Sequence, residues 1–163
     1  MKKLTHSTFL LACLSIVLVV AAACVPVPPP AAVPAAAPTA TPSNAITDIV
    51  WQWTSVANRT TGETTTVVDP QNYTITFRTD GTLSGKADCN SFTGTYSQEG
   101  GFTITLGATT MAACAEGSLD QQYLDLLGAV AAGGPDGQGN LALETAGGEQ
   151  RMLFVNGGAA PAP

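Results

Sequence analysis

The sequence is short of charge in general and of basic residues and histidine in particular. Its 163 residues include six lysines and arginines, twelve aspartates and glutamates and a single histidine, His6, which gives a net charge of −6. Without the first 23 residues, which hold Lys2 and Lys3, four basic residues oppose the twelve acidic ones and the net charge is −8. So acidic a chain repels phosphate backbones, and we expect no nucleic-acid partner. A polybasic patch for anionic lipid is also missing.

The absence of histidine after His6 removes the commonest general base, which excludes a Ser-His-Asp or Cys-His hydrolase. Carboxylate pairs remain as candidates for glycoside hydrolysis, and the nearest are Asp80 with Asp88 and Glu116 with Asp120. Each of these residues has a plainer role in a turn, near a bend or at a helix N-terminus. Two cysteines without histidine fall short of the four ligands usual for zinc. We therefore expect neither an enzyme nor a metal or other cofactor.

No apolar run is long enough to cross a membrane comfortably. Lys2 and Lys3 precede an apolar run over residues 9–23 that only Ser15 interrupts. This pattern is typical of a secretory signal peptide, whereas a transmembrane helix needs roughly 20 apolar residues. We expect residues 1–23 to be a signal peptide, and an uncleaved anchor helix is the alternative.

Three alanines, residues 21–23, stand directly before Cys24 and resemble the lipobox of bacterial lipoproteins. The larger aliphatic residue usual at the third position before the cysteine is missing. We expect cleavage before Cys24 and a lipid on its sulfur, so that the protein is extracytoplasmic and bound to the cell membrane by its anchor. Cleavage without lipidation is the alternative. Lipidation at Cys13 is a weaker hypothesis because cleavage there would leave an apolar stretch exposed.

Two segments are unsuited to folding. Residues 24–44 contain seven prolines and no charged or aromatic side chain. Such a segment favours polyproline II and could hold a domain up to about 60 Å from the membrane at roughly 3.1 Å per residue. The tail, residues 157–163, has a similar composition, and we expect it to be disordered. One domain of residues 45–156 remains.

Within this domain, apolar residues alternate with polar ones in short segments, which predicts antiparallel strands with one buried face. The first segment surrounds Trp51 and Trp53, and residues 72–87 form a hairpin around the turn Asp80-Gly81. A second hairpin covers residues 92–106. Two last strands, residues 141–144 and 151–155, are joined through Gly147-Gly148.

One segment has helical periodicity instead. Leu119, Tyr123, Leu126, Leu127 and Val130 fall on one helical face. Ser118 followed by Gln121 predicts a capping box at the start, and Gly133-Gly134-Pro135 is expected to end the helix, with a glycine-rich loop through residue 139. The fold class is therefore α+β, a curled, partly open, barrel-like antiparallel sheet packed with one α-helix.

Two stretches carry a family resemblance, Phe77 to Tyr96 and Thr109 to Cys114. They follow the pattern F-x-x-D-G, then G-x-x-x-C-N-x-F-x-G-x-Y, then T-x-M-A-x-C, and Trp51 supplies the tryptophan of the first strand. In these motifs the sequence resembles the META domain, also called the heat-shock HslJ-like domain (DUF306), over residues 45–156. The motif residues are Trp51, Asp80, Gly81, Gly85, Asn90, Phe92, Gly94, Tyr96, Thr110 and Met111.

The resemblance implies an exported protein, often a lipoprotein, in a family with members linked to heat stress or novobiocin tolerance and none established as an enzyme. One departure is Asp88, which stands where the family commonly has glycine and leaves the backbone geometry beside Cys89 open.

Once Cys13 is removed and Cys24 lipidated, Cys89 and Cys114 are the remaining thiols. Outside the cytoplasm two such cysteines most simply form a disulfide. Buried reduced thiols are the alternative, and a redox role is weaker because there is no C-x-x-C.

Two kinds of binding role remain open. Asn90 could contact a ligand, although asparagine often bonds local backbone instead. Trp51, Trp53, Phe92 and Tyr96 could line a groove, although in a small domain they are expected to pack the core. We hypothesise a monomeric, non-catalytic surface-binding module of the envelope whose partner is an unknown envelope protein or small ligand. A carrier of a small apolar ligand or lipid is the alternative.

Overall fold

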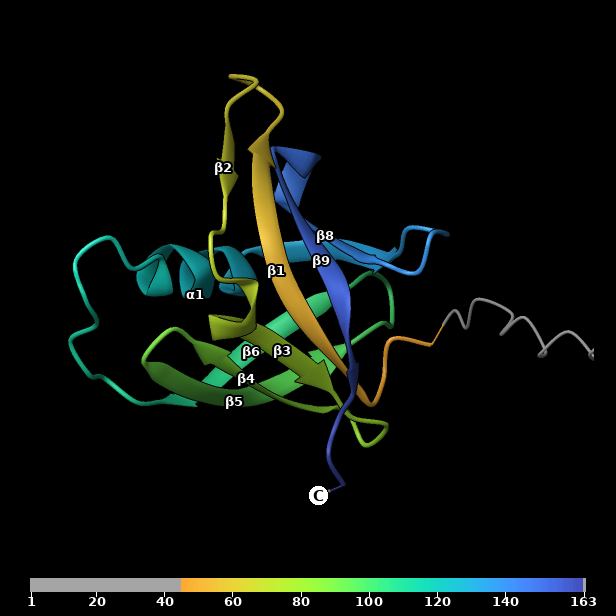
Figure 1. The fold of residues 1–163 in the computed structure, drawn as a ribbon. Coiled ribbons are helices and arrows are strands. Elements are labelled where there is room, and N and C mark those ends of the chain that lie inside the picture. The colour runs from red at the N-terminus through yellow and green to blue at the C-terminus, as the bar shows by residue number, and fades with distance from the viewer. Residues whose placement is uncertain (1–44, 163) are drawn as a thin grey trace, which may run out of the picture. The chain divides into compact units, whose positions relative to one another are not determined.

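The structure, a computed structural model, describes residues 45–162. The expected signal peptide, Cys24 and the tether lie outside these residues. The described chain forms nine strands, one α-helix and two short 3-10 helices (Figure 1). In chain order the elements are β1 (Ile49–Asn58), β2 (Thr64–Thr66), η1 (Pro70–Asn72), β3 (Tyr73–Phe77), β4 (Thr82–Ala87), β5 (Asn90–Ser97), β6 (Thr103–Thr109), α1 (Asp120–Gly128), β7 (Val130–Pro135), β8 (Leu141–Thr145), η2 (Ala146–Gly148) and β9 (Gln150–Ala159).

The strands form one antiparallel sheet in the order β6-β5-β4-β3-β1-β9-β8-β7, and β2 pairs with the second half of β1. The sheet curls into a half-barrel, as the strands of Figure 1 show. Its two ends approach each other where the N–H of Phe102 donates to the carbonyl of Ala131 at 3.3 Å. The expected fold class, a curled antiparallel sheet with one helix, is confirmed.

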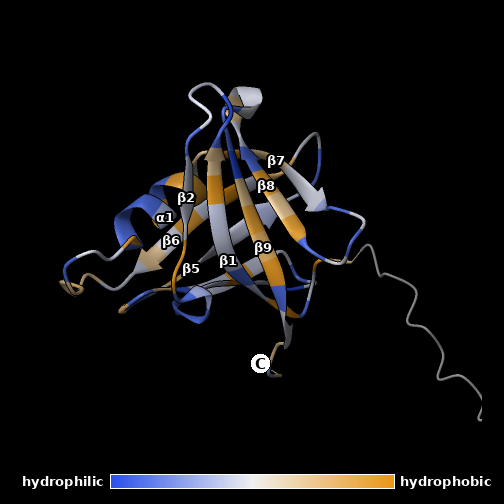
Figure 2. Ribbon diagram, turned by 45° about the horizontal axis from the view of Figure 1, so that its top comes forward, coloured by the Kyte–Doolittle hydropathy of each residue, from blue (hydrophilic) through white to orange (hydrophobic). Residues whose placement is uncertain are grey.

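The core follows from the alternation of buried and exposed side chains along strands such as β1 and β9. Figure 2 shows the apolar stretches of β8 and β9 that contribute to it. Trp51 and Trp53 are buried and Gln52 between them is not, because successive side chains point to opposite faces of a strand. The next buried residue of β1 is Val56, three positions on, since the register with β9 shifts between Trp53 and Ser55. A bulge therefore keeps the apolar side of β1 facing the core.

Both expected hairpins are present. Ile75 pairs with Gly85 in the β3–β4 hairpin, and Tyr96 pairs with Ile104 in the β5–β6 hairpin. The two expected last strands are β8 and the first part of β9, joined through η2. In these segments buried and exposed side chains alternate along each strand, and turn residues separate one strand from the next. The local sequence pattern therefore agrees with the fold.

The expected start of the helix is wrong. α1 begins at Asp120, with Leu119 at the N-cap and no side-chain cap. Ser118 accepts the N–H of Asp120 at 3.2 Å, but Gln121 does not complete a box. The N–H of the N-cap residue Leu119 is bound by a distant side chain, because the hydroxyl of Tyr73 accepts it at 2.9 Å.

The expected end of the helix is also wrong, since α1 stops at Gly128 and the expected terminator, Gly133-Gly134-Pro135, lies in strand β7. Val130, expected on the helix, begins that strand and pairs with Thr145. β7 lies at the sheet edge, where proline and glycine are tolerated because one side of the strand needs no partner. No helix within residues 45–162 has the length and apolarity needed to cross a membrane.

The expectation of a disordered tail is wrong for its first part. β9 continues through Ala159, which pairs with Ile49 of β1. The N–H of Ala160 then donates to the carbonyl of Asp48 at 2.9 Å. Composition alone gives this glycine- and alanine-rich segment no reason to be ordered, and the neighbouring strand β1 supplies its hydrogen bonds.

Candidate functional site

The side chain of Asn90 is the centre of a hydrogen-bond cluster at the start of β5. It is only 3% exposed. Its Oδ1 accepts the N–H of Ala112 at 2.8 Å and the hydroxyl of Thr110 at 3.1 Å. Its Nδ2 donates to the Ala112 carbonyl at 3.1 Å, to the Asp120 carboxylate at 3.2 Å and to the Cys114 sulfur at 3.4 Å. Of the two hypotheses for Asn90, these contacts favour the structural one, because buried amides need such partners.

Cys89 and Cys114 form a disulfide, with the sulfurs 2.02 Å apart and the Cα atoms 5.5 Å apart. The expected pairing is confirmed, and the alternative of reduced thiols is not found. The bond joins the β4–β5 turn to the segment 110–118 that leads into α1. Together with Asn90 it fixes this segment at two neighbouring points.

Asp88 and Cys89 are the central residues of the β4–β5 turn, because Ala87 and Asn90 pair on either side. Asp88 has a φ of 56°. A positive φ at the first central position is typical of a type II′ turn, which favours glycine. The backbone geometry that the sequence left open is therefore left-handed, a conformation that glycine adopts without strain. The N–H of Asp88 donates to the Asn72 carbonyl at 2.7 Å.

The turn Asp80-Gly81 is tied to β5 by hydrogen bonds. Asp80 accepts the hydroxyl of Thr82 at 2.6 Å and its N–H at 2.9 Å, and these bonds lower the pKa of the Asp80 carboxyl. Gly81 has a φ of 82°, and its carbonyl accepts the N–H of Tyr96 at 2.9 Å. The hydroxyl of Tyr96 donates to the carbonyl of Arg78 at 2.9 Å. Asp80, Gly81 and Tyr96 of the motif therefore stabilise one corner of the sheet.

Two further motif glycines allow close packing. A Cβ on Gly85 would collide with the Phe92 ring and the Thr74 carbonyl. A Cβ on Gly94 would collide with the carbonyl of Thr105 on the neighbouring strand. Both positions are therefore required by the fold rather than by a ligand.

The aromatic side chains that could have lined a groove pack the core instead. Trp51, Trp53 and Phe92 are buried, and Tyr96 packs against the cluster from its edge. The Trp53 ring stacks on Tyr123 of α1 with centroids 5.0 Å apart. The packing hypothesis is therefore the one that the contacts favour.

Tyr123 fills the centre of the half-barrel. Its side chain is fully buried, and its hydroxyl has no hydrogen-bond partner among residues 45–162. Burial raises the pKa of this hydroxyl well above its usual value. The space beneath the sheet is thus occupied by aromatic rings, which disfavours an apolar ligand in the interior.

Met111 is a motif residue that does not join the core. Its side chain is 87% exposed. It follows Thr110, whose hydroxyl accepts the N–H of Ser91 at 2.9 Å. The segment that carries Met111 is held firmly, while the methionine itself faces solvent.

The carboxylates of the two candidate pairs are found at structural positions within residues 45–162. Asp80 and Asp88 lie at opposite ends of β4, because one precedes and the other follows that strand. Asp120 is bound to Asn90, and Glu116 lies exposed on the segment before α1. Within the described part of the chain no three histidine, cysteine, aspartate or glutamate side chains gather where a metal ion could bind.

A groove of about 1000 Å³ lies on the outer face of β4 and β5. Its floor carries exposed hydroxyls in register, because Thr82 pairs with Thr95 and Ser84 pairs with Thr93. Ala160 of the C-terminal segment lines its edge. The groove offers donors and acceptors of hydrogen bonds, which suits a polar ligand.

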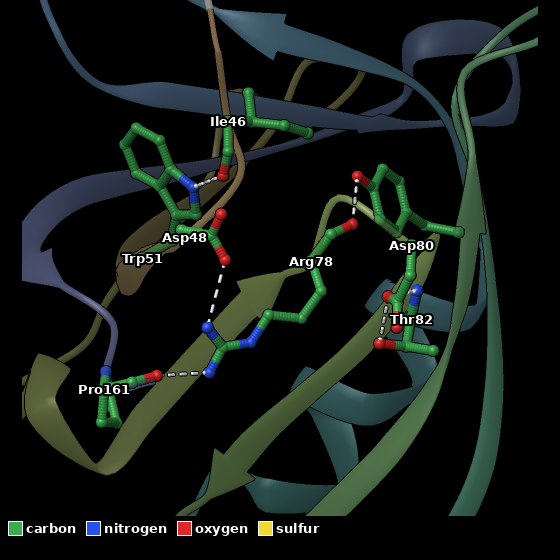
Figure 3. Close-up of polar contacts among 8 residues, drawn as sticks. Ile46, Asp48, Trp51, Arg78, Asp80, Thr82 and Pro161 are labelled. Carbon is green, nitrogen blue, oxygen red and sulfur yellow. Dashed lines mark hydrogen bonds and ion pairs between the residues drawn. The ribbon is translucent and has the colours of Figure 1, made fainter. Parts of the chain in front are cut away.

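Arg78 lines this groove and was not singled out by sequence reasoning. Figure 3 shows its polar contacts. Its guanidinium pairs with the Asp48 carboxylate at 3.1 Å and donates to the Pro161 carbonyl at 2.8 Å. It thereby holds the C-terminal segment beside the start of β1. Two features of the sequence could have pointed to Arg78. It is one of four basic residues after residue 23, and it stands between Phe77 and Asp80 of the motif.

The half-barrel with one helix and a disulfide-held segment defines a class of small α+β domains. The chain belongs to the META domain family, which matches residues 44–157. No curated protein matches the sequence significantly.

Among solved structures, a DUF4847 family protein from Bacteroides vulgatus ATCC 8482 is similar, with 15% identity and a TM-score of 0.50. The similarity covers 68% of this chain and 93% of that one. At this identity it supports the fold alone.

Proposed function

We propose that this META domain protein is a non-catalytic binding module, displayed at the cell envelope on a lipid anchor at Cys24 and a Pro/Ala-rich tether. Its role is envelope maintenance or stress and antibiotic tolerance. The signal-like residues 1–23 and the tether composition support the location. The family resemblance supports the absence of catalysis.

The observation that carries the binding role is the groove beside Arg78. Its hydroxyls belong to exposed residues of two paired strands, so their spacing is fixed by the sheet register. The backbones of Ser84 and Thr95 belong to the β4–β5 ladder. Their side-chain hydroxyls have no hydrogen-bond partner within residues 45–162 and are available to a ligand. Groups held in place before binding cost less entropy when the ligand arrives.

The charge of the domain narrows the partner. With a net charge of −8 after residue 23, the surface repels nucleic acid and anionic lipid headgroups. A neutral, hydroxyl-rich envelope component fits the groove better. We therefore place uncharged glycan fragments first among the ligands to be tested.

The binding experiment is a titration of the lipidated protein with peptidoglycan fragments, neutral glycans and envelope lipids, followed by NMR shifts of the β4 and β5 amides. Ser84→Tyr fills the groove from its exposed floor and should abolish those shifts. Thr64→Tyr, on the exposed face of β2, is the matched control and should leave them unchanged. No shift with any ligand, or shifts that survive Ser84→Tyr, would count against the groove.

The anchor is tested by mass spectrometry of the protein extracted from its own membrane. Cleavage before Cys24 with an added acyl mass is the expected result. A protein that retains Met1 and is found in the cytosol would overturn the proposed location.

The absence of catalysis is tested by replacing the carboxylates that could act in hydrolysis. Asp80→Asn, Asp88→Asn and Glu116→Gln should leave the cellular phenotype of the wild type intact. Loss of that phenotype in a variant that still folds would indicate an enzyme.

No specific observation favours the alternative function, in which the protein carries a small apolar ligand. The interior that it requires is filled by Trp53, Tyr123 and Phe154, all fully buried. Native mass spectrometry of the extracted protein should therefore find no bound lipid beyond the covalent anchor.

A further inference from the structure

A second hollow lies on another part of the domain, where the C-terminal end of α1 faces the η2 turn. It has a volume of about 710 Å³. The helix contributes Asp125 and Leu126 to its lining, and the segment around η2 contributes Ala146 and Glu149. None of these residues lines the groove beside Arg78. We call this hollow the α1–η2 cleft.

The local structure holds the two sides of the cleft in place. The N–H of Ala146 donates to the Ala129 carbonyl at 3.3 Å and joins the turn to the helix end. The Thr145 hydroxyl accepts the N–H of Gln150 at 3.1 Å across the turn. Gly147 and its neighbour Gly148 have φ values of 73° and 71°, which let the chain reverse tightly. The cleft is therefore part of the folded domain.

The cleft has a negative electrostatic character from two sources. Asp125 and Glu149 are exposed carboxylates on its opposite sides. The C-terminal end of a helix adds partial negative charge, which favours a cation within the last turn. α1 has no basic residue in its last turn to supply that cation.

The neighbouring arginines do not neutralise the cleft. Arg59 and Arg151 both bind Glu144, at 2.8 Å and 3.3 Å. Neither arginine lines the cleft. Asp125 accepts only one side-chain bond from within residues 45–162, from Gln121 at 3.2 Å. A positive charge entering the cleft would therefore meet two carboxylates that form no ion pair with any basic side chain of residues 45–162.

The floor of the cleft is apolar. Leu126 is 9% exposed, and Ala129 and Ala146 present methyl groups beside it. A fully hydrated metal ion gains nothing from such a floor, whereas a methylene chain does. The amides of Gln122 and Gln150 complete the polar rim.

We propose that the α1–η2 cleft binds a primary ammonium group carried on a short apolar stem, as in a lysine side chain or a small alkylamine. The stem lies on Leu126 and the alanine methyls, and the ammonium group lies between Asp125 and Glu149. The α1–η2 cleft shares no lining residue with the groove beside Arg78. The proposal for the cleft can therefore be tested whatever the groove binds.

The test is an NMR titration of the full mature chain in nonionic detergent with n-butylammonium, with n-butanol as the neutral control. Butylammonium should shift the amides of Ala129 and Gln150 saturably, and added salt should weaken the binding. Butanol should produce much smaller shifts. Equal shifts with both compounds, or shifts that map elsewhere, would overturn the proposal.

Variants separate the contribution of each carboxylate. Asp125→Asn and Glu149→Gln should each raise the dissociation constant by about threefold to fivefold, as for an exposed ion pair. Glu99→Gln, on the exposed β5–β6 turn, is the matched control and should change nothing. Both variants lie at exposed positions, so folding should be retained, and unchanged thermal unfolding would confirm that. Unchanged affinity in the folded double variant would overturn the proposal.

The source of the ammonium group is distinguished with two capped amino acids. N-acetyl-lysine methylamide and N-acetyl-norleucine methylamide share the same stem and differ in the charged group. Tighter binding of the lysine compound than of butylammonium would assign the site to a protein partner with an exposed lysine. Tighter binding of butylammonium would assign it to small amines. No binding of either cation would contradict the proposal.

Discussion

The side chain of Asn90 holds the backbone of Ala112 from both sides, accepting its N–H at 2.8 Å and donating to its carbonyl at 3.1 Å. A residue on a neighbouring antiparallel strand would make the same pair of hydrogen bonds through its backbone. Here the side-chain amide of Asn90 makes both. It orders the segment before α1 at a place where the sheet has ended.

Asn90→Ala should therefore destabilise the domain by about 3 kcal/mol, because it leaves several buried polar groups without partners. The backbone amide of Ala112 should also exchange much faster. Urea unfolding and hydrogen exchange measure the two effects. Asn156→Ala is the control, because it removes an exposed side chain whose one hydrogen bond within residues 45–162 comes from the N–H of Gly158, and it should cost less than about 1 kcal/mol. Similar losses in the two variants would contradict the central role of Asn90.

Removing the disulfide should cost a comparable amount. Cys89 and Cys114 are 25 residues apart, and closing such a loop in the unfolded chain stabilises the fold by about 3 kcal/mol. The double variant Cys89→Ala with Cys114→Ala should show this loss in urea unfolding. The wild type treated with a reducing agent should match it, and a reduced protein as stable as the oxidised one would contradict the expected contribution of the disulfide.

Tyr123→Phe should stabilise the protein. The hydroxyl of Tyr123 is buried without a partner among the described residues, and such a group costs on the order of 1 kcal/mol or more. Removing the oxygen keeps the ring that stacks on Trp53. Thermal unfolding should show a higher midpoint for Tyr123→Phe. Tyr73→Phe is the contrasting variant and should destabilise, because the hydroxyl of Tyr73 accepts the N–H of Leu119.

Substitutions at Asp88 should depend on backbone conformation more than on charge. With a φ of 56°, a β-branched residue is strained, and Asp88→Val should lose about 1 to 3 kcal/mol. Asp88→Gly removes the strain but loosens the unfolded chain, so the net change should stay within about 1 kcal/mol. Unfolding by urea compares the two variants, and a valine variant as stable as the glycine variant would show that the left-handed turn is not retained.

The stability of the domain should fall in acid partly through Asp80. Hydrogen bonds from the Thr82 hydroxyl and N–H lower the pKa of Asp80 in the folded chain. A carboxyl whose pKa is lower when folded stabilises the fold above its unfolded value, about 3.9, and this contribution is lost as the pH falls through the folded value. Asp80→Asn should therefore flatten the loss of stability below about pH 4. In Thr82→Val the NMR titration of Asp80 should move toward higher pH, and an unchanged titration would show that the Thr82 hydroxyl does not lower this pKa.

The hairpins could be predicted because alternation and turn residues lie close together in the sequence. The disulfide partners could be predicted because few cysteines are candidates. Alternation around Asp80-Gly81 predicts the β3–β4 hairpin, and two remaining cysteines allow one pairing. The ends of α1 could not be predicted in this way. Ser118 and Gln121 have the spacing of a capping box, but the Ser118 N–H that Gln121 would bind donates to the Ala115 carbonyl instead. The Tyr73 hydroxyl accepts the N–H of Leu119 from across the fold.

The candidate sites were less accessible to sequence reasoning than the fold. Arg78 matters because Asp48 and Pro161, 30 residues before and 83 residues after it, meet at its guanidinium. The α1–η2 cleft joins residues of the helix to a turn that follows another hairpin. Neither grouping leaves a periodic pattern in the chain, since it arises from distances between elements.

The sequence by itself determined the two hairpins, the strands that line the core and the presence of a single helix, because burial on one face of a strand or helix imposes a period that can be read along the chain. Its motifs determined the family. Only the tertiary structure decided which glycine-rich segments are ordered. β7 and the end of β9 have no apolar period to mark them. They are strands because neighbouring strands supply the hydrogen bonds that their own residues cannot specify.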